Sequence, residues 1–257
     1  MKPEDIQRVK DLLPTSLGSS ELRDTIAKDI LRRSIFSARM ASAHYLAKLR
    51  DVCTAISGGA INNADARAQL LTVLEQMGHS PQDEGGLRNP ASIRRLNLIL
   101  DTQRQMAASV ARLSEETEAT AFMDPAWELV RMGTRRVPRE DWPARWRAAG
   151  DSVNWEGALK DRFIALKSSP IWQALGDGAG GFADTLGNPY PPFAFSSGMS
   201  WLQVDRETCE RLGLIEPGAS AGIPDTPSLS PDEKDIADAA KRYGFDESYF
   251  DDILEGL

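Results

Sequence analysis

Arginine residues gather in one short stretch of this sequence and give it its clearest capacity for binding chemistry. A guanidinium group can form two parallel hydrogen bonds with a phosphate or a carboxylate, so clustered arginines can bind nucleic acid or an acidic protein surface. Residues 131–167 include nine basic and five acidic residues. Six arginines fall in the first half of that stretch: Arg131, Arg135, Arg136, Arg139, Arg145 and Arg147.

The arginine cluster has three interpretations. In the first it is a solvated surface whose arginines pair with nearby acids: Glu140, Asp141 and Asp151. The chain as a whole carries a net charge of −8, and a local excess of four positive charges is modest, which favours this interpretation. In the second, four arginines contact DNA or an acidic partner: Arg131, Arg135, Arg136 and Arg139. In the third, an acidic segment of this chain or of a neighbouring copy covers the cluster.

Residue types suited to catalysis are few. The chain has two histidines, His44 and His79, and two cysteines, Cys53 and Cys209, neither of which belongs to a CxxC pair. It contains no GxxxxGK[ST], GxSxG or HExxH motif. The glycines of residues 176–181 follow no clear strand, and we expect an ordinary flexible loop there. We therefore predict no enzymatic activity, no catalytic residues, no metal site and no cofactor.

Apolar spacing predicts helices in the N-terminal half of the chain. One long helix is expected over residues 20–57, and a shorter helix is capped by Asn62 or Asn63. A second long helix is expected to run from Asn89, as its cap, to Ser114. Together these elements predict a long helical hairpin with a short cross-piece.

Two residues inside these helices have specific expected roles. Cys53 lies among apolar residues and is expected to act as a small buried hydrophobe. Gln103 interrupts an apolar stripe, and we expect it to make a polar contact between helices.

The character of the sequence changes after Pro125. Short strands are expected at residues 127–131 and 162–166, and a short helix at 204–213 with Asp205 as its cap. The tryptophans of this region are most simply explained as anchors of a core and its loops: Trp127, Trp142, Trp146, Trp155, Trp172 and Trp201.

Residues 188–201 form an uncharged stretch with three prolines and four aromatic residues. Proline excludes a helix or a central strand, and the aromatic side chains need cover from water. The stretch is therefore either a rigid loop locked onto a core or a docking surface, and the motif order described below favours the loop. Its candidate structural residues are Tyr190, Pro191, Pro192, Phe193 and Phe195.

The C-terminal part has a separate composition. Residues 216–229 are rich in Pro, Gly, Ser and Ala and are expected to form a linker. Residues 230–257 hold nine acidic and three basic residues and are expected to form a short amphipathic helical module. Three aromatic residues of this acidic tail are candidates for docking a partner: Tyr243, Tyr249 and Phe250.

These expectations together predict an α+β protein with a mostly helical N-terminal half, a small α+β domain and a short C-terminal helical module. The expected boundaries are residues 1–122, 123–215, 216–229 for the linker and 230–257 for the tail. A charged N-terminus without a signal-peptide apolar region, and the lack of a long apolar run, predict a cytoplasmic protein that does not contact a membrane.

The order of motifs in the second half resembles that of the head morphogenesis, or minor head, proteins of Mu-like tailed phages. These motifs are Trp127-Glu-Leu-Val-Arg131, Arg136-Val-Pro-Arg139, Trp142-x-x-x-Trp146, Ala165-Leu-Lys167, Ser169-Pro-Ile-Trp172 and Tyr190-Pro-Pro-Phe193. The resemblance extends over about residues 20–215, because the N-terminal half has a similar order of helices and loops.

The resemblance implies a structural protein inside or beside the portal of a phage or prophage head. Its partners would be portal or other capsid proteins, with DNA as a further contact, and its oligomeric state stays open. Its location would be the bacterial host cytoplasm during assembly and then the virion head. Relatives carry a cysteine pair where this chain has residues 196–199 and a histidine near Glu140, so no metal or cysteine role is carried over.

Two alternatives from other classes stay open. The first is a toxin-like enzyme such as an ADP-ribosyltransferase, which needs an Arg or His with a Glu beside a nucleotide cleft. Glu128 with Arg131 is a poor match to that requirement. The second is an adaptor or chaperone whose helical hairpin binds a helix of another protein.

Overall fold

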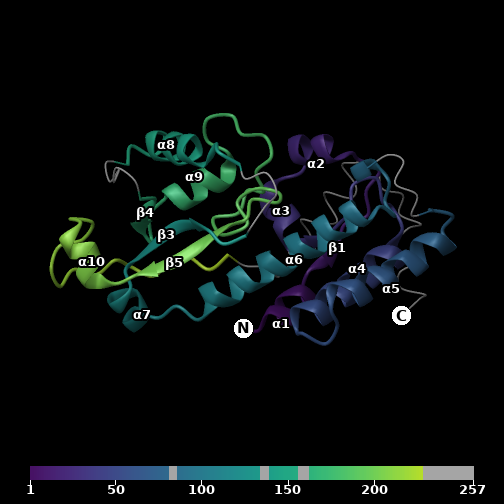
Figure 1. The fold of residues 1–257 in the computed structure, drawn as a ribbon, viewed down its shortest axis with the longest axis horizontal. Coiled ribbons are helices and arrows are strands. Elements are labelled where there is room, and N and C mark those ends of the chain that lie inside the picture. Colours follow the sequence, from purple (N-terminus) through teal and green to yellow (C-terminus); the bar gives the residue numbers. More distant parts are fainter. Residues whose placement is uncertain (81–85, 134–138, 156–161, 228–257) are drawn as a thin grey trace. The chain divides into compact units, whose positions relative to one another are not determined.

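The structure is a computed structural model that describes residues 1–80, 86–133, 139–155 and 162–227 (Figure 1). The described chain divides into two compact units, unit 1 over Met1–Ala108 and unit 2 over Ser109–Pro227. Helices and small sheets occur together, which confirms the predicted α+β class. None of the described helices is long and apolar enough to cross a membrane.

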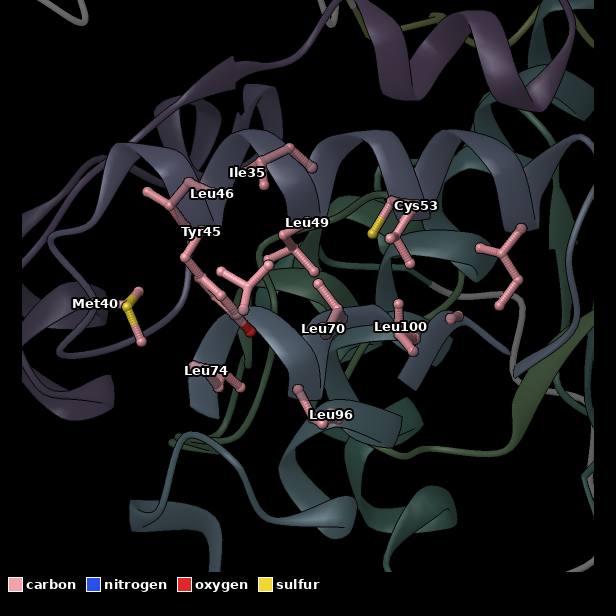
Figure 2. Close-up of a cluster of buried hydrophobic side chains, with 14 of the residues drawn as sticks. Ile35, Met40, Tyr45, Leu46, Leu49, Cys53, Leu70, Leu74, Leu96 and Leu100 are labelled. Atoms are coloured by element: carbon pink, nitrogen blue, oxygen red, sulfur yellow. The ribbon is translucent and has the colours of Figure 1, made fainter. Parts of the chain in front are cut away.

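The core of unit 1 lies between three helices, α4 (Ala43–Ser57), α5 (Asn63–Gln76) and α6 (Ile93–Ser114). Their apolar side chains point into one cluster, shown in Figure 2, whose members include Tyr45, Leu46, Leu49, Leu70, Leu74, Leu96 and Leu100. Removing these side chains from water supplies the main stabilisation of unit 1. Asn62 caps α5 by accepting hydrogen bonds from the backbone N–H groups of Ala64 and Asp65, as the sequence predicts.

The predicted single helix over residues 20–57 is wrong. The chain forms α2 (Ser19–Thr25), α3 (Lys28–Arg33), the two-residue strand β2 (Ser34–Ile35) and only then α4. β2 pairs in parallel with β1 (Asp11–Leu12), which follows the short helix α1 (Pro3–Arg8). The long arm of the predicted hairpin is therefore replaced by short elements that fold back on unit 1.

Hydrogen bonds from elsewhere in unit 1 explain this break. The buried Arg95 of α6 donates to the hydroxyl of Ser37 at 2.7 Å and to the carbonyl of Ala38. Arg39 has a φ of 58°, which no α-helix accommodates, and Ser42 then caps α4. The apolar periodicity is real, but it belongs to separate elements whose apolar faces are buried in two clusters.

The start of α6 also differs from the prediction. Asn89 holds a turn by accepting from the N–H of Ala91, while the hydroxyl of Ser92 accepts from the N–H of Arg95. The helix therefore begins at Ile93, after the 3₁₀ turn Gly86–Arg88 and a further turn.

A polar seam fastens α1 and the residues after it to α6. Gln7 donates to the carbonyl oxygen of Gln103 at 2.6 Å, and the ammonium of Lys10 donates to the Gln103 side-chain oxygen at 2.7 Å. The Gln103 side chain, predicted to make a polar contact between helices, thus contacts Lys10 just after α1, while α1 itself bonds to the Gln103 backbone. Burial lowers the pKa of Lys10 to about 8 and raises the pKa of the Cys53 thiol to about 12, and Cys53 is the buried small hydrophobe expected.

Unit 2 is built on an antiparallel sheet with the strand order β4 (Ile164–Leu166), β3 (Ala126–Arg131), β5 (Met199–Val204). β3 and β4 confirm the two predicted strands, although β4 is shorter than expected. β5 was not predicted, because it begins inside the proline-rich stretch, at Met199.

One face of this sheet carries an aromatic core. Trp127 of β3 and Trp201 of β5 stack with ring centroids 3.9 Å apart and an interplanar angle of 7°. Trp172 of α9 (Ile171–Asp177) meets both rings edge-on, and Trp146 of α8 (Trp142–Ser152) lies 5.3 Å from Trp172. Phe193 completes the group at 6.1 Å from Trp172. The prediction that tryptophans anchor a core is confirmed.

The opposite face of the sheet is covered at one end by α10 (Arg206–Arg211). Cys209 packs there against Ala126, Ile164 and Val204. Asp205 caps α10 by accepting from the N–H of Thr208 at 2.8 Å, as predicted.

A buried ion pair joins two connections of unit 2. Lys167, directly after β4, donates to both carboxylate oxygens of Glu116, at 2.8 and 2.7 Å. Glu116 precedes α7 (Glu118–Met123), and the side chains of Lys167 and Glu116 are 0% and 3% exposed. Two charges held so far from water depend on each other.

Replacing Glu116 with Gln leaves the Lys167 ammonium buried without its counter-charge. We expect the Glu116→Gln variant to lose about 3–5 kcal/mol of unfolding free energy in urea titrations. The neighbouring, exposed Glu115→Gln serves as the control and should change stability by no more than about 0.5 kcal/mol. Equal losses in the two variants would contradict a dependence of unit 2 on this ion pair.

Lys10 gives unit 1 a distinct dependence on pH. Below about pH 8 the amine is charged in both the folded and the unfolded chain, so the cost of burying the charge is present in full. Between about 8 and 10.5 only the unfolded chain keeps the proton, so the Lys10 contribution to stability rises with pH. Lys10→Met removes this dependence, and the difference in unfolding free energy between wild type and variant should change by about 3 kcal/mol over that range.

The measurement is urea unfolding of both proteins at a series of pH values. Ionisation of Cys53 in the unfolded chain acts in the opposite direction above pH 9, but both proteins contain this thiol, so comparing them isolates Lys10. Parallel stability curves for the two proteins would show that Lys10 is not the source of the dependence.

Candidate functional site

The arginine cluster is distributed over the end of β3, the connection that follows and the first turns of α8. β3 ends at Arg131, and α8 begins at Trp142 and carries Arg145 and Arg147. Arg139 precedes α8, whereas Arg135 and Arg136 lie outside the described residues. The structure therefore places four of the six arginines.

Arg145 lies on the buried side of α8. Its guanidinium donates to a carboxylate oxygen of Asp141 at 2.8 Å, one helical turn away, and to Asp184 Oδ1 at 2.7 Å. The same group lies over the rings of Phe182 and Trp142, at 4.3 and 5.2 Å from their centroids. Charge, hydrogen bonds and aromatic faces therefore all hold Arg145 inside unit 2.

Asp184 joins Arg145 to Arg139. The Arg139 guanidinium donates to Asp184 Oδ2 and, at 2.9 Å, to the backbone carbonyl of Phe195. Partial burial of the Asp184 carboxyl raises its pKa, but the hydrogen bonds and charges of Arg145 and Arg139 outweigh that effect, so the pKa lies below its ordinary value. Asp184 therefore stays ionised and links α8 to the proline-rich stretch.

This geometry separates the arginines into two kinds. Arg139 and Arg145 are matched by two carboxylates, so they add no net charge to the surface. Arg131 and Arg147 are exposed, and the bonds they make to described residues are to a backbone carbonyl, of Arg139 at 2.5 Å and of Pro143 at 3.2 Å respectively. Of the four arginines predicted to contact DNA or an acidic partner, Arg131 is the one described with its charge facing water.

Sequence reasoning missed Asp184, although a signal for it exists. Asp184 is the one charged residue between Asp177 and Asp205. A single carboxylate in an otherwise uncharged, aromatic segment is expected to have a cationic partner when it is buried. The acids proposed as partners were Glu140, Asp141 and Asp151, of which Asp141 does pair with Arg145.

The candidate structural residues of the proline-rich loop lie mostly in the interior of unit 2. Tyr190, Pro191, Pro192 and Phe193 are buried, and Phe195 is half-buried. Asn188, itself fully buried, donates to the carbonyl of Pro192 at 3.1 Å. This placement is the one that a structural role requires, while the role itself stays a prediction.

Gly176 lets this loop approach α9 closely. A Cβ atom built on Gly176 would lie 1.8 Å from the carbonyl oxygen of Asn188. The carbonyl of Gly176 accepts from the N–H of Gly187 at 2.8 Å. Gly176 is thus a helical residue at a packing contact, where a loop was expected, and α9 ends at Asp177 with Gly178 as its C-cap at a φ of 78°.

The structure does not bring Glu128 and Arg131 together in the way that the ADP-ribosyltransferase alternative would require. Glu128 forms a two-pronged ion pair with Arg162, at 2.9 and 2.5 Å, instead of facing Arg131. His44 is exposed on α4. Over residues 1–80, 86–133, 139–155 and 162–227, no group of three or more His, Cys, Asp or Glu is placed to hold a metal ion. The predicted docking residues Tyr243, Tyr249 and Phe250 fall outside the described part of the chain.

Comparison with protein-family models, curated proteins and solved structures finds no match to this chain.

The two kinds of arginine predict two different mutant phenotypes. Arg139→Gln removes one cation from Asp184 and should lower the unfolding free energy by about 1–3 kcal/mol. Arg131→Gln should stay within about 0.5 kcal/mol of wild type. In the DNA-contact hypothesis, Arg131→Gln should also reduce the slope of log K against log salt by about 0.9, measured as retention on duplex DNA over a salt series.

Two results would contradict these expectations. A lack of any salt-dependent retention at low ionic strength would remove the arginines as DNA contacts. A stability loss in Arg131→Gln equal to that in Arg139→Gln would contradict the distinction between an exposed and a bridging arginine.

Proposed function

We propose that this protein is a structural, non-enzymatic component of a phage or prophage head, acting at the portal or the capsid interior. One observation carries the proposal. The ordered motifs of the second half, which resemble those of minor head proteins of Mu-like phages, supply the interlocking residues of one packed unit.

The packing contacts show how residues of the separate motifs meet in unit 2. Four of the motifs each supply one aromatic ring, and these rings contact one another in a continuous chain: Trp127, Trp172, Trp146 and Phe193. The second motif supplies Arg139, which donates to the carbonyl of Phe195 just beyond the last motif. Because these motifs supply packing residues, their shared order supports a similar domain structure in this protein and the minor head proteins.

The surface chemistry is consistent with assembly contacts. Arg131 and Arg147 offer exposed positive charge on unit 2, which suits an acidic protein surface or a DNA phosphate. The acidic tail, residues 230–257, adds a segment of opposite charge with aromatic residues for a partner. Portal or other capsid proteins are therefore the partners we propose, with DNA as a further contact.

The decisive experiment is to induce particles from a bacterium that carries the gene and to analyse purified heads by mass spectrometry. We expect the protein to co-purify with full-length portal protein through a density gradient, and a portal gene to lie beside its own gene. A control strain with this gene deleted should yield no infectious heads, and a plasmid copy should restore them.

Two results would count against a role in a phage head. A gene located in a metabolic operon, together with the absence of the protein from purified heads, would overturn the proposal. Binding of a dinucleotide by calorimetry, with loss of that binding in Glu128→Gln, would favour the ADP-ribosyltransferase alternative.

A further inference from the structure

Residues 219–226, here called the strap, lie along the surface of unit 2. The sequence predicts a linker in this region because it is rich in Pro, Gly, Ser and Ala. In the structure the strap is attached to three separate elements of unit 2. It therefore occupies a defined binding surface.

Three side chain to backbone hydrogen bonds hold the strap. Arg206 of α10 donates to the carbonyl of Ala219 at 2.9 Å, and the Ser168 hydroxyl donates to the carbonyl of Ala221. At the far end, the hydroxyl of Thr226 donates to the carbonyl of Leu113 in α6 at 3.4 Å. We call the surface formed by Arg206, Ser168 and Leu113 the strap site.

The strap buries little of itself. Ala221 and Pro224 are its buried residues, whereas Ser220, Gly222, Ile223 and Asp225 are exposed. Two small side chains and three hydrogen bonds give a weak attachment. Such an attachment is favourable mainly because the strap is covalently tethered beside its site, where its effective concentration is high.

A tight turn connects the strap to α10 and its following residues. The N–H of Ala219 bonds to the carbonyl of Glu216 at 3.0 Å, and Gly218 has a φ of 76° with no atom within 4 Å of a Cβ built there. Opening this turn removes one hydrogen bond and would send the strap away from its own unit. Short hinges of this kind favour exchange of a terminal segment between identical chains.

We propose that the strap site is an exchangeable binding site, filled by the chain's own strap when the protein is isolated and by the strap of a second copy when copies are concentrated. The three hydrogen bonds that hold the strap to the described residues are all made by unit 2. A neighbouring copy can therefore offer the same three hydrogen bonds and the same sites for Ala221 and Pro224. Exchange needs no new chemistry, only a local concentration that exceeds that of the tethered strap.

The acidic tail gives exchange a physical consequence. The strap is followed in sequence by residues 228–257, whose nine acidic and three basic residues account for most of the chain's net charge of −8. When the strap of one copy binds the strap site of a second copy, the acidic residues that follow the strap are also tethered to the second copy. The inference stands independently of the proposed role in a phage head, because it rests only on contacts within unit 2.

The geometry at Ser168 allows a direct test by disulfide trapping. A Cβ atom built on Gly222 lies 3.6 Å from the Cβ of Ser168, which is within the range of about 3.5–4.5 Å found in disulfides. Gly222 has a φ of 73°, so a cysteine there costs about 1–2 kcal/mol, and the fold of each variant is checked by near-UV circular dichroism. The two native cysteines are buried and do not compete.

The experiment uses three full-length proteins and a fourth as a control. Ser168→Cys in one protein and Gly222→Cys in another, differing in an affinity tag, are mixed over a range of concentrations and oxidised. A disulfide between them forms only when the strap of one copy lies on the strap site of the other. The third protein carries both substitutions and reports the strap on its own unit. The matched control replaces Gly222→Cys by Asp225→Cys, an exposed strap position about 10 Å further along an extended chain.

We expect an intramolecular disulfide in the double variant and a mixed dimer whose yield rises with concentration and disappears in the Asp225→Cys control. An intramolecular disulfide without any mixed dimer would show that the strap stays on its own chain and would overturn exchange. A mixed dimer of equal yield with Asp225→Cys would mark random collision and would also overturn it. The absence of both disulfides would show that the strap does not occupy the site at all.

Discussion

The stacking of Trp127 on Trp201 is the constraint on which unit 2 depends. The two residues lie diagonally on neighbouring strands, since Trp201 is paired with Leu129. A shift of one residue between β3 and β5 would move one indole to the opposite face of the sheet and destroy the stack. Because Trp172 and Phe193 pack against this pair, the positions of α9 and the proline-rich loop follow from the strand register.

The sequence was sufficient where local chemistry alone decides the structure. The caps at Asn62 and Asp205 are examples, because a side chain and the N–H groups two or three residues later form a complete interaction. The aromatic core of unit 2 could also be predicted, since large apolar rings have few other stable environments.

The failures have a common physical origin in contacts between distant residues. The break near Ser37 depends on Arg95, 58 residues away in the sequence, and β1 pairs with a strand that periodicity assigns to a helix. The partner of Arg139 is 45 residues away, in a segment with no other charge. Spacing within a window of residues carries no information about such partners, so the nearby partner Asp141 was recognised while the distant Asp184 was not.

The ion pairs of unit 2 change what its arginines can contribute to binding. A guanidinium already bonded to a carboxylate must lose that partner before it contacts a phosphate, which removes much of the gain. The positive charge on this surface is therefore smaller than the residue count suggests. Recognition of an acidic partner would rest on the exposed arginines and on the shape that the bridging ones maintain.

The chemical modification of Lys10 can report local opening of unit 1. The Lys10 amine is fully buried, so an acylating reagent in the solvent reaches it only during moments when α1 separates from α6. In those exposed moments burial no longer lowers its pKa, so the amine reacts as an ordinary surface lysine would. The rate at which Lys10 is modified would thus follow the rate at which the N-terminal helix opens. Local unfolding of unit 1 could therefore be measured on the native chain without any added label.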